Sequence, residues 1–519
     1  MAFIGIDLGT TNSVVCEYKK GITNLIQIDG KDSVPSVIYI DNDSVEVGEK
    51  AKKRILIHPE LTMSSTKRLI GKNFNQKVQG KNYTPVDVAY HIIQYIKSNA
   101  EKVIGEPISE AVITVPAYFD DQQRKETRNA AERAGLKVLR LLPEPTAAAI
   151  AYGLDKEKDQ QLLVFDLGGG TFDVSILEVK DNNFIVKAVD GNNQLGGDDF
   201  DKVIVEYLNH WIEKNYHKSA RGNSAVQQKL KEEAEKIKID LSQSKFTNIS
   251  IPNVMDDIDL EIDKFTRKEF KELIRPYLQE IVRKTNDVIV DAGLSTDDLN
   301  RIVMVGGSSK NPIIQETITS NFKQPFRADN MDSYVARGAA IVCASLLSPI
   351  DDGLKNVPVD LVFSDVISHT LGIGMLDSIE KKRIFVPILK RNETYPIKSA
   401  VLGMRDEKWQ ESIRICVYRG EDNDPANNTK LGELTIDISP KFRGIDSPIY
   451  FSNIFELDKD GILTFTTIEI PVDNENQLDV DYLLNEFIEN QRLTYNQIQS
   501  VTEKYNFKSE KIEIKKGLL

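Results

Sequence analysis

Two short segments of the sequence place an aspartate, a glycine-rich turn and hydroxyl side chains between two apolar runs. In residues 3–16 the turn comprises Asp7, Gly9, Thr10, Thr11 and Asn12, and in residues 162–179 it comprises Asp166, Gly168, Gly169, Gly170 and Thr171. Each pattern predicts a β-hairpin with a tight turn. Because glycine has no side chain, the backbone N–H groups of such a turn can come close to an anion.

The repetition of this pattern roughly 160 residues apart predicts two similar subdomains that face each other across a cleft. A polyphosphate held between the two turns would meet amide donors and hydroxyls from both sides. Asp7 and Asp166 could then hold a hydrated Mg²⁺. The sequence contains no Gly-x-x-x-x-Gly-Lys segment followed by Ser or Thr, so a P-loop is not the phosphate site.

Helices and strands must position these turns and the side chains around them. Apolar residues at helical spacing predict helices over Asp87 to Val103, Gln122 to Ala134, Gln227 to Ser242 and Val335 to Leu347. Strands are predicted over Ala111 to Val115 and over Ile302 to Val305. The second of these strands runs into Gly306, Gly307 and Ser308, where the backbone can approach a ribose or a phosphate.

Four longer motifs occur in addition to the two turns, at Thr114 to Phe119, Glu144 to Ala149, Leu195 to Asp201 and Val305 to Ser309. With these motifs the chain resembles the seventy-kilodalton heat-shock chaperones of the DnaK type, from residue 2 to about residue 473. The resemblance implies an actin-like duplicated ATPase domain, a β-sandwich peptide-binding domain and a short helical tail. It also implies ATP or ADP and Mg²⁺ as cofactors.

The resemblance assigns roles to individual residues. The residues expected to act in catalysis are Lys67 and Thr171 at the γ-phosphate, Glu144 and Asp173 at the attacking water, and Asp166, which with Asp7 holds hydrated Mg²⁺. Nucleotide contacts are further expected from Gly9, Thr10, Thr11, Asn12, Gly168, Gly169, Gly170, Gly196, Gly197, Glu235, Lys238, Ser242, Gly306, Gly307, Ser308, Lys310 and Asp332. Such chemistry needs positioning and charge neutralisation rather than a covalent intermediate.

The spacing of Glu235, Lys238 and Ser242 puts them on one helical face. Family members use this face to bind adenosine, although the spacing alone favours a solvated Glu–Lys pair. Ile239 and Lys310 lie where relatives often have two basic side chains around the adenine. Ile239 has no guanidinium, so we expect weaker stacking on the base.

Breaker residues and alternating strands, together with what the resemblance implies, divide the chain into four predicted parts: residues 1–347 as the ATPase domain, 348–366 as a linker, 367–473 as the β-sandwich and 474–519 as a truncated helical lid or tail. The segment between Phe74 and Tyr83 is shorter than its family counterpart, and so is the tail. These two departures resemble the small specialised bacterial branch typified by HscC. Phe363 and Ser364 replace usual leucines in the linker, whose alternative reading is a first strand of the sandwich.

By position in the family, the apolar peptide pocket of the sandwich would be lined by Ile373, Met375, Leu376, Leu402, Ile413 and Ile415. Alternating apolar residues also form ordinary strand cores. Pro116 and Arg124 stand where the family relays nucleotide state to the second domain. Arg140 and Asp365 match positions that bind a J-domain co-chaperone, but Pro143 replaces a usual asparagine beside the first.

The overall composition narrows the possible partners. With 519 residues, 40% of them hydrophobic, the chain can bury large cores, and its net charge of −13 argues against nucleic-acid or anionic-membrane partners. Cys16, Cys343 and Cys416 are widely spaced, which is typical of reduced packing cysteines. No long apolar run or signal peptide is evident, so we expect a cytoplasmic protein.

The sequence thus predicts an ATP-dependent chaperone that binds exposed apolar segments of unfolded proteins, with release gated by ATP binding and hydrolysis. Expected partners are such peptide segments and a J-domain co-chaperone. Whether a nucleotide exchange factor is also a partner is left open. Two alternatives remain at this point. One is a small-molecule kinase on the actin-like fold, and the other is a nucleotide-dependent scaffold without peptide cycling.

Overall fold

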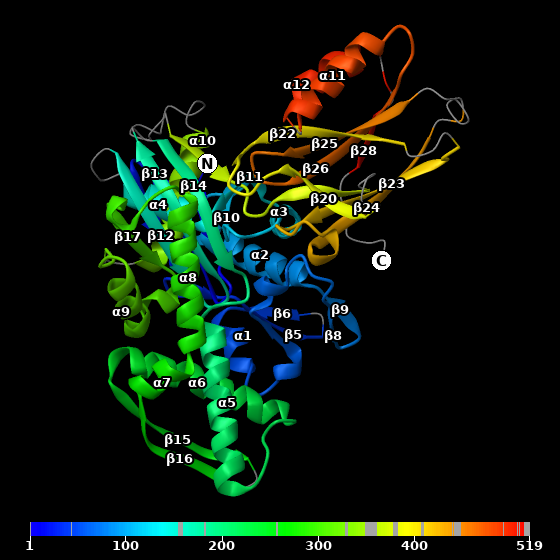
Figure 1. Cartoon of the computed structure of the whole chain (residues 1–519). Coiled ribbons are helices and arrows are strands. Elements are labelled where there is room, and N and C mark those ends of the chain that lie inside the picture. Colours follow the sequence, from blue (N-terminus) through cyan, green and yellow to red (C-terminus); the bar gives the residue numbers. More distant parts are fainter. Residues whose placement is uncertain are drawn as a thin grey trace. The chain divides into compact units, whose positions relative to one another are not determined.

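The computed structural model describes residues 2–42, 44–153, 159–180, 183–255, 258–326, 331–347, 361–376, 382–405, 409–438, 440, 448–490, 492–505, 507 and 509–512. The chain divides into two compact units, residues 1–365 and 366–519 (Figure 1). Residues 348–360, most of the predicted linker, lie outside the described part. The unit of residues 1–365 consists of two lobes, each built on its own sheet.

The sheet of the first lobe has the strand order β11-β10-β1-β2-β3. Its strands are β1 (Phe3–Asp7), β2 (Asn12–Lys19), β3 (Ile22–Leu25), β10 (Glu110–Val115) and β11 (Lys137–Pro143), with β4 (Val34–Pro35) paired to β2. Strands β1 and β2 are antiparallel, as are β2 and β3, whereas β1 is parallel to β10. Around it lie β5 (Val37–Asp41), β6 (Ser44–Val47), β7 (Thr62–Ser64), β8 (Gln76–Val78), β9 (Lys81–Tyr83), α1 (Glu49–Arg54), η1 (Pro59–Leu61), η2 (Thr66–Leu69), α2 (Pro85–Ile104), α3 (Asp121–Arg133) and α4 (Glu144–Gly153).

The sheet of the second lobe contains the strand order β17-β12-β13-β14-β18, and its first four strands pair with the same directions as β10, β1, β2 and β3. A meander of antiparallel strands, β12 (Gln160–Leu167), β13 (Phe172–Lys180) and β14 (Asn183–Asn192), is joined in parallel by β17 (Arg301–Val305) on one side and β18 (Val362–Val366) on the other. The lobe also contains β15 (Phe246–Met255), β16 (Ile258–Thr266), α5 (Gly197–Tyr216), α6 (Ser224–Gln243), α7 (Arg267–Leu273), α8 (Arg275–Asp291), η3 (Thr296–Asp298), η4 (Gly307–Lys310) and α9 (Pro312–Asn321). The first hairpin of each sheet is therefore the predicted one, and the structure confirms both.

Local sequence explains where the main helices begin and end. Helix α2 begins with a capping box of Thr84 and Asp87 and ends at Gly105, whose φ of 80° favours glycine. Helix α3 begins with a second capping box, made by Asp120 and Gln123. Both observed helices match the predicted ones to within two residues at each end.

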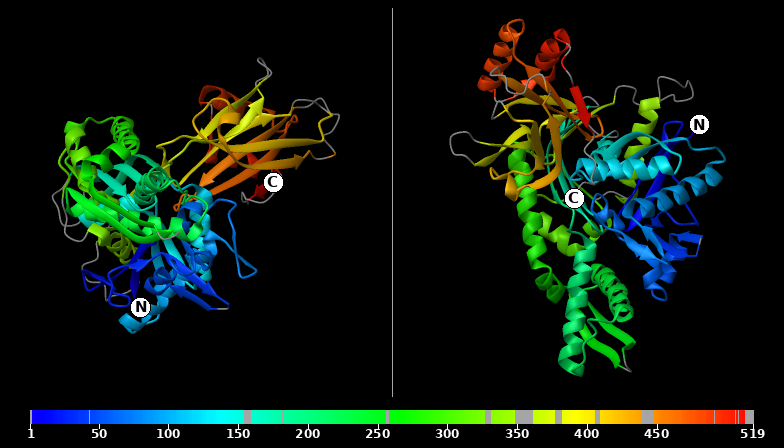
Figure 2. Two further views of the ribbon diagram at one scale, coloured as in Figure 1. Left: turned by 90° about the horizontal axis from the view of Figure 1, so that it is seen from below. Right: turned by 90° about the vertical axis from the view of Figure 1, so that its right-hand side faces the viewer.

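The last helix of this unit joins the two lobes. Helix α10 (Tyr334–Leu347), preceded by η5 (Met331–Ser333), packs against α4, β1 and β2 of the first lobe. Gly338 permits the close approach, because a Cβ there would lie 1.8 Å from the carbonyl oxygen of Ala147. Both views of Figure 2 show the blue and cyan elements of the first lobe beside the green elements of the second.

In its described residues, the unit of residues 366–519 contains two antiparallel sheets and two α-helices. One sheet has the order β20-β19-β23-β24, and the other has the order β27-β22-β25-β26-β28. The elements are β19 (Leu371–Leu376), β20 (Arg383–Leu389), β21 (Thr394–Tyr395), β22 (Ile397–Met404), β23 (Ser412–Arg419), η6 (Pro425–Asn427), β24 (Thr429–Asp437), β25 (Ile449–Leu457), β26 (Leu463–Pro471), α11 (Gln477–Asn490), β27 (Leu493–Thr494), α12 (Tyr495–Lys504) and β28 (Ser509–Ile512).

The core of this second unit lies in two clusters. Residues from both sheets, among them Ile373, Ile415 and Phe455, form the cluster between the sheets. A separate cluster joins the other face of β22, β25 and β26 to the two helices, and it includes Leu483 and Ile498. The tail is thus packed onto the sandwich.

Candidate functional site

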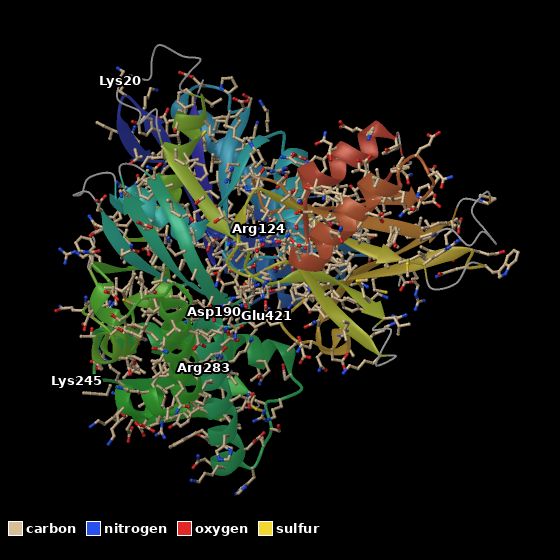
Figure 3. The ribbon with its side chains drawn as sticks, turned by 45° about the horizontal axis from the view of Figure 1, so that its top comes forward. Lys20, Arg124, Asp190, Lys245, Arg283 and Glu421 are labelled. Atoms are coloured by element: carbon tan, nitrogen blue, oxygen red, sulfur yellow. The ribbon has the colours of Figure 1, made fainter. Side chains whose placement is uncertain are left out.

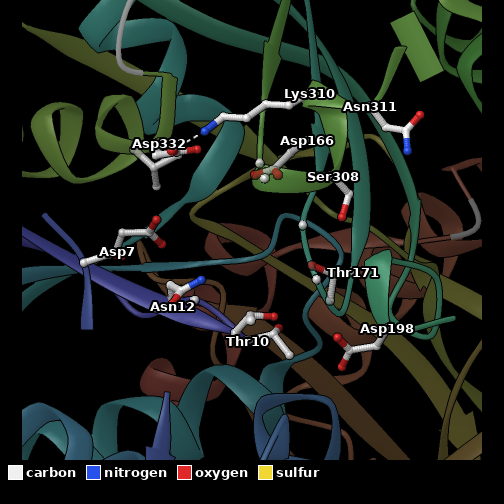
Figure 4. A pocket seen from close by; sticks show the side chains of 18 of the residues that line it. Asp7, Thr10, Asn12, Asp166, Thr171, Asp198, Ser308, Lys310, Asn311 and Asp332 are labelled. Atoms are coloured by element: carbon white, nitrogen blue, oxygen red, sulfur yellow. Dashed lines mark hydrogen bonds and ion pairs between the residues drawn. The ribbon is translucent and has the colours of Figure 1, made fainter. Parts of the chain in front are cut away.

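A cavity of about 350 Å³ lies between the two glycine turns in the unit of residues 1–365. Figure 4 shows Asp7 and Asp166 entering it from different strands, with Thr10, Asn12 and Thr171 on the turns. Most of the predicted site residues line this cavity: Asp7, Gly9, Thr10, Thr11, Asn12, Lys67, Glu144, Asp166, Gly168, Gly169, Thr171, Glu235, Lys238, Ser242, Gly306, Gly307, Ser308, Lys310 and Asp332. Residues that were up to 325 positions apart in the sequence therefore share one cavity, as 332 minus 7 gives 325.

Four predicted residues do not line the cavity but support the turns that do. Asp173 pairs with Asp166 across the second hairpin, and its Oδ1 accepts a hydrogen bond from the backbone N–H of Tyr118 at 2.9 Å. Gly196 allows the start of α5 to pack closely against the second turn, because a Cβ there would lie 2.5 Å from the carbonyl oxygen of Gly169. A Cβ on Gly170 would instead meet Thr10 and Arg68, and a Cβ on Gly197 would meet Ser308. The backbone N–H of Gly197 donates to the carbonyl oxygen of Gly168 at 3.0 Å.

Lys67 and Glu144 form a buried ion pair at the cavity wall. Lys67 Nζ lies 2.6 Å from Glu144 Oε1, and the two side chains are 6% and 9% exposed. The ammonium group also lies 5.6 Å from the centre of the Phe119 ring. An ammonium held in this way carries positive charge into a largely water-free site, where it interacts strongly with anions.

The carboxylates around the cavity repel one another. Burial, and then repulsion from Glu144, raise the pKa of Asp7 to about 7, although Lys67 opposes this. The same two causes raise the pKa of Asp173 to about 7, and they raise that of Asp166 well above its ordinary value. The site therefore lacks positive charge that would balance its carboxylates.

These carboxylates fit a hydrated divalent cation better than a directly ligated one. In the described part of the chain, no three His, Cys, Asp or Glu side chains are placed to ligate a metal ion together. A carboxylate oxygen of Asp173, Oδ2, is buried and makes no hydrogen bond to the described residues. Mg²⁺ commonly keeps several waters and uses one or two carboxylates. Asp7 and Asp166 are the residues that would hold it.

The predicted adenosine face of α6 also lines the cavity. Lys238 Nζ lies 2.7 Å from the carboxylate of Asp201 and 3.1 Å from the carbonyl oxygen of Gly197, so Lys238 is tied to the start of α5. Glu235 lies 3.9 Å from Lys52 of the first lobe rather than pairing with Lys238. Ile239 lines the cavity and is 49% exposed. Lys310 pairs with Asp332 at the opposite wall (Figure 4).

Sequence reasoning missed some residues of the site. Asp198 and Asn311 line the cavity without having been predicted. Both stand next to predicted glycine turns, so their positions in the sequence were a usable signal. Arg68, which directly follows Lys67, was also missed. Its ion-pair partner, Asp199, lies 131 positions away in the sequence.

The predicted linker extends the sheet of the second lobe. Residues Val362, Phe363 and Ser364 pair in parallel with Asn183, Phe184 and Ile185 of β14. The guanidinium of Arg140 lies 4.7 Å from the centre of the Phe363 ring, and Asp365 Oδ1 accepts a hydrogen bond from Thr146 Oγ1 at 2.8 Å. This part of the linker therefore docks on the unit of residues 1–365 despite the two replaced leucines.

The buried Arg124 holds the loop that follows Pro116, and both residues were predicted to relay nucleotide state. Arg124, labelled in Figure 3, is 3% exposed and donates hydrogen bonds to the carbonyl oxygens of Phe119 and Ala117 at 3.1 and 3.3 Å. These carbonyls belong to the loop that follows Pro116. The same loop supplies the backbone N–H that Asp173 accepts. Arg124 is thus linked through this loop to Asp173, which supports the second turn.

Five of the six predicted pocket residues of the sandwich lie on β19 and β23. Ile373 and Ile415 are buried in the cluster between the sheets, Met375 and Ile413 are partly buried against it, and Leu376 is 50% exposed. The sixth residue, Leu402, does not belong to the cluster between the sheets, and its place in a peptide pocket stays a prediction. Leu402 packs in the helix-covered cluster, because strand alternation points Val401 and not Leu402 between the sheets.

Three exposed apolar side chains lie at or just before the ends of strands of the sandwich. Leu376 ends β19, Met404 ends β22, and Trp409 precedes β23; they are 50%, 57% and 68% exposed. A Cβ on Gly403 would lie 4.0 Å from Met375 Cε, so the ends of β19 and β22 are close together.

Comparison with protein families agrees with this geometry. The family profile described as Hsp70 protein matches residues 3–517. The chain belongs to the Hsp70 family. Members of this family are ATPases that bind ATP or ADP, act as chaperones, and bind unfolded peptides and J-domain co-chaperones. No helix in the described part of this Hsp70 chain is long and apolar enough to cross a membrane.

Proposed function

We propose that this protein is an ATP-dependent chaperone that hydrolyses Mg·ATP and uses the cycle to bind and release exposed apolar peptide segments. The cavity between the two turns carries the proposal most directly. It brings together phosphate-binding turns, a buried lysine and acidic side chains, all within a chain of the Hsp70 family. The cytoplasm is the proposed place of action, and a J-domain protein is a proposed partner.

The residues have distinct roles in the proposed reaction. The turns at Gly9 to Asn12 and Gly168 to Gly170 would donate backbone N–H groups to the phosphates. Lys67 would neutralise charge on the transferred phosphoryl group, and Glu144 and Asp173 would orient the attacking water. Bound Mg²⁺ would supply charge neutralisation beside Asp7 and Asp166. The Lys67–Glu144 pair holds both side chains in place before the nucleotide enters.

The apolar strand ends of the sandwich are the proposed peptide site. Leu376, Met404 and Trp409 offer exposed apolar surface, and Met375, next to Leu376 in the sequence, is partly buried. The trimmed edge of the first lobe, where only the short strands β8 and β9 lie between η2 and α2, supports membership of the HscC-like branch. The β-sandwich also argues against a small-molecule kinase, which would need an acceptor-binding insertion. No described feature favours a polymerising scaffold.

The function is tested by steady-state ATPase measurements on the intact chain with and without an extended apolar peptide. We expect the peptide to stimulate hydrolysis, and we expect the variant Leu376→Asp to lose that stimulation while keeping its basal rate. The matched control is Leu478→Asp, since Leu478 is 85% exposed on α11 of the same unit. Equal stimulation of all three proteins would rule out the proposed peptide site.

A further inference from the structure

Arg68 makes a buried ion pair with a residue of the opposite lobe. It lies in η2, directly after Lys67, and its side chain points to the start of α5. Arg68 Nη2 donates to Asp199 Oδ2 at 2.5 Å, and Nη1 donates to Asp199 Oδ1 at 3.2 Å. The two side chains are 7% and 8% exposed. Such a two-point contact fixes orientation as well as distance.

Arg68 also reaches the second phosphate-binding turn. Its Nη2 donates to the carbonyl oxygen of Gly169 at 3.3 Å. A Cβ added to Gly170 would lie 2.8 Å from Arg68 Nε, so glycine is what allows the guanidinium to lie against the turn. One side chain of the first lobe therefore contacts both α5 and the turn of the second lobe.

Asp199 is also hydrogen-bonded to the backbone of the second lobe. Its Oδ2 accepts a hydrogen bond from the backbone N–H of Gly196 at 2.9 Å. The backbone N–H of Asp198 in turn donates to the carbonyl oxygen of Gly169 at 2.8 Å. Burial alone would raise the pKa of Asp199, but hydrogen bonds from Arg68 and Lys202 lower it overall. The carboxylate is therefore held in its charged form between the two lobes.

Lys67 and Arg68 are consecutive residues of one short 3₁₀ helix. Lys67 faces Glu144, while Arg68 faces Asp199. The position of the second phosphate turn is thus mechanically connected to the position of the lysine expected at the γ-phosphate. No role was assigned to Arg68 or Asp199 from the sequence.

We propose that Arg68 is a positioning residue that, through Asp199, ties the second phosphate-binding turn to the segment carrying Lys67, so that closure of the lobes and placement of Lys67 occur together. The proposal rests on the proposed ATPase function. It predicts that loss of the pair slows hydrolysis of bound ATP more than it weakens nucleotide binding. Loss of a residue that merely stabilised the fold would not slow hydrolysis more than it weakens nucleotide binding.

The test compares single-turnover hydrolysis and equilibrium Mg·ADP affinity in the variants Arg68→Gln, Asp199→Asn and the double variant. We expect each single change to slow hydrolysis by roughly 10-fold to 100-fold, with an affinity loss several times smaller. The double variant should be no slower than the worse single variant, because both changes remove one interaction. Arg68→Lys should recover part of the rate, since an ammonium keeps the charge but not the two-point contact.

Lys202→Gln is the matched control. Lys202 Nζ lies 2.9 Å from the same Asp199 carboxylate, but Lys202 is on α5 itself and is 66% exposed, so its loss breaks no contact between the lobes. This variant should hydrolyse ATP at the wild-type rate. The proposal would be overturned if the fold-losses in hydrolysis rate of the two single variants multiplied in the double variant. Equal fold-losses in hydrolysis rate and in Mg·ADP affinity would also overturn it. If Arg68→Gln fails to fold, Arg68→Lys and Asp199→Asn are compared in its place, and an unchanged hydrolysis rate in both overturns the proposal.

The outcome is separable from that of the proposed function. A wild-type chain that neither binds nor hydrolyses Mg·ATP would refute the ATPase itself. A wild-type chain that hydrolyses ATP, with Arg68→Gln equally fast, would refute only the role of Arg68.

Discussion

At the scale of single residues, the cavity gathers carboxylates around one lysine. Asp7, Asp166 and Asp173 all have a raised pKa, first because they are buried and then because Glu144 repels them. Such an arrangement is costly without a cation, because buried charges of one sign cannot all remain ionised. The carboxylates are therefore better explained by binding than by stability of the nucleotide-free protein.

The raised pKa of Asp7 predicts that the effect of Asp7→Asn on the free energy of unfolding depends on pH. The pKa of Asp7 is raised from 3.8 to about 7, so the folded protein binds more protons than the unfolded one between these values. The free energy of unfolding contributed by this group therefore falls as pH rises through that range. We expect Asp7→Asn to stabilise the nucleotide-free protein at pH 8 by on the order of 2 kcal/mol, and much less at pH 4.

Urea denaturation at both pH values, without nucleotide or Mg²⁺, measures this difference. A stability gain of the same size at pH 4 and pH 8 would contradict the assignment of the raised pKa to Asp7.

Lys67 is predicted to act on the transition state rather than on binding. Removing one preorganised charge, in Lys67→Ala, should lower single-turnover hydrolysis by roughly 10²-fold or more. Nucleotide binding should remain measurable, because we expect the turns to supply most phosphate contacts. Rapid-quench measurement of the hydrolysis of bound ATP tests this prediction. A wild-type rate in Lys67→Ala would show that Lys67 is not a catalytic residue.

At the scale of elements, the predicted short tail turns out to be part of the sandwich. Helices α11 and α12 bury Val480, Leu483, Ile498 and Val501 against the outer face of β22, β25 and β26. A helix pair with its own share of the core is an integral layer of the unit. This packing differs from a hinged cover, which would need a face able to detach.

We therefore expect Leu483→Ala to destabilise the unit of residues 366–519 as a whole. Leu483 is 0% exposed, and truncating a buried leucine to alanine costs about 2–5 kcal/mol. Thermal unfolding followed by circular dichroism measures the loss. The control Leu478→Ala changes an 85% exposed side chain of the same helix and should have little effect. Melting that is unchanged by Leu483→Ala would show that the helices are not part of this core.

Most elements could be predicted from the sequence, because periodicity and caps are local signals. The helix predicted over Gln227 to Ser242 is α6, Ser224–Gln243, and the one predicted over Val335 to Leu347 is α10, Tyr334–Leu347. The strand predicted over Ala111 to Val115 is β10, Glu110–Val115. These signals depend on neighbouring residues only, so they do not need the fold.

Two features could not be predicted in the same way. Both faces of β22 are covered, one by the other sheet and one by the helices, so alternation could not tell whether Leu402 faces the pocket. The pairing of Arg68 with Asp199 joins residues 131 positions apart. An arginine beside a predicted lysine gives no local sign of such a partner. Long-range pairs become visible only when the two lobes are placed together.

At the scale of the molecule, the chain combines the unit of residues 1–365, for which we propose ATP binding, with a unit that presents exposed apolar strand ends. The linker strand β18 extends the sheet of the ATP-binding unit beside β14. It is therefore a covalent connection that is also hydrogen-bonded to the lobe holding Asp166 and Asp173. A change in that lobe on hydrolysis could reach the linker through β13 and β14 without any further element.

The central claim is that Mg·ATP binds between the two look-alike turns. Equilibrium titration of Mg·ATP into the intact chain, alongside Asp7→Asn and Asp166→Asn, tests it most directly. The account predicts saturable binding by the wild type that requires Mg²⁺ and that weakens by about tenfold or more in each variant, a loss of roughly 1.4 kcal/mol or more. A folded wild-type chain that binds no Mg·ATP, or variants that bind it as tightly as the wild type, would contradict the account.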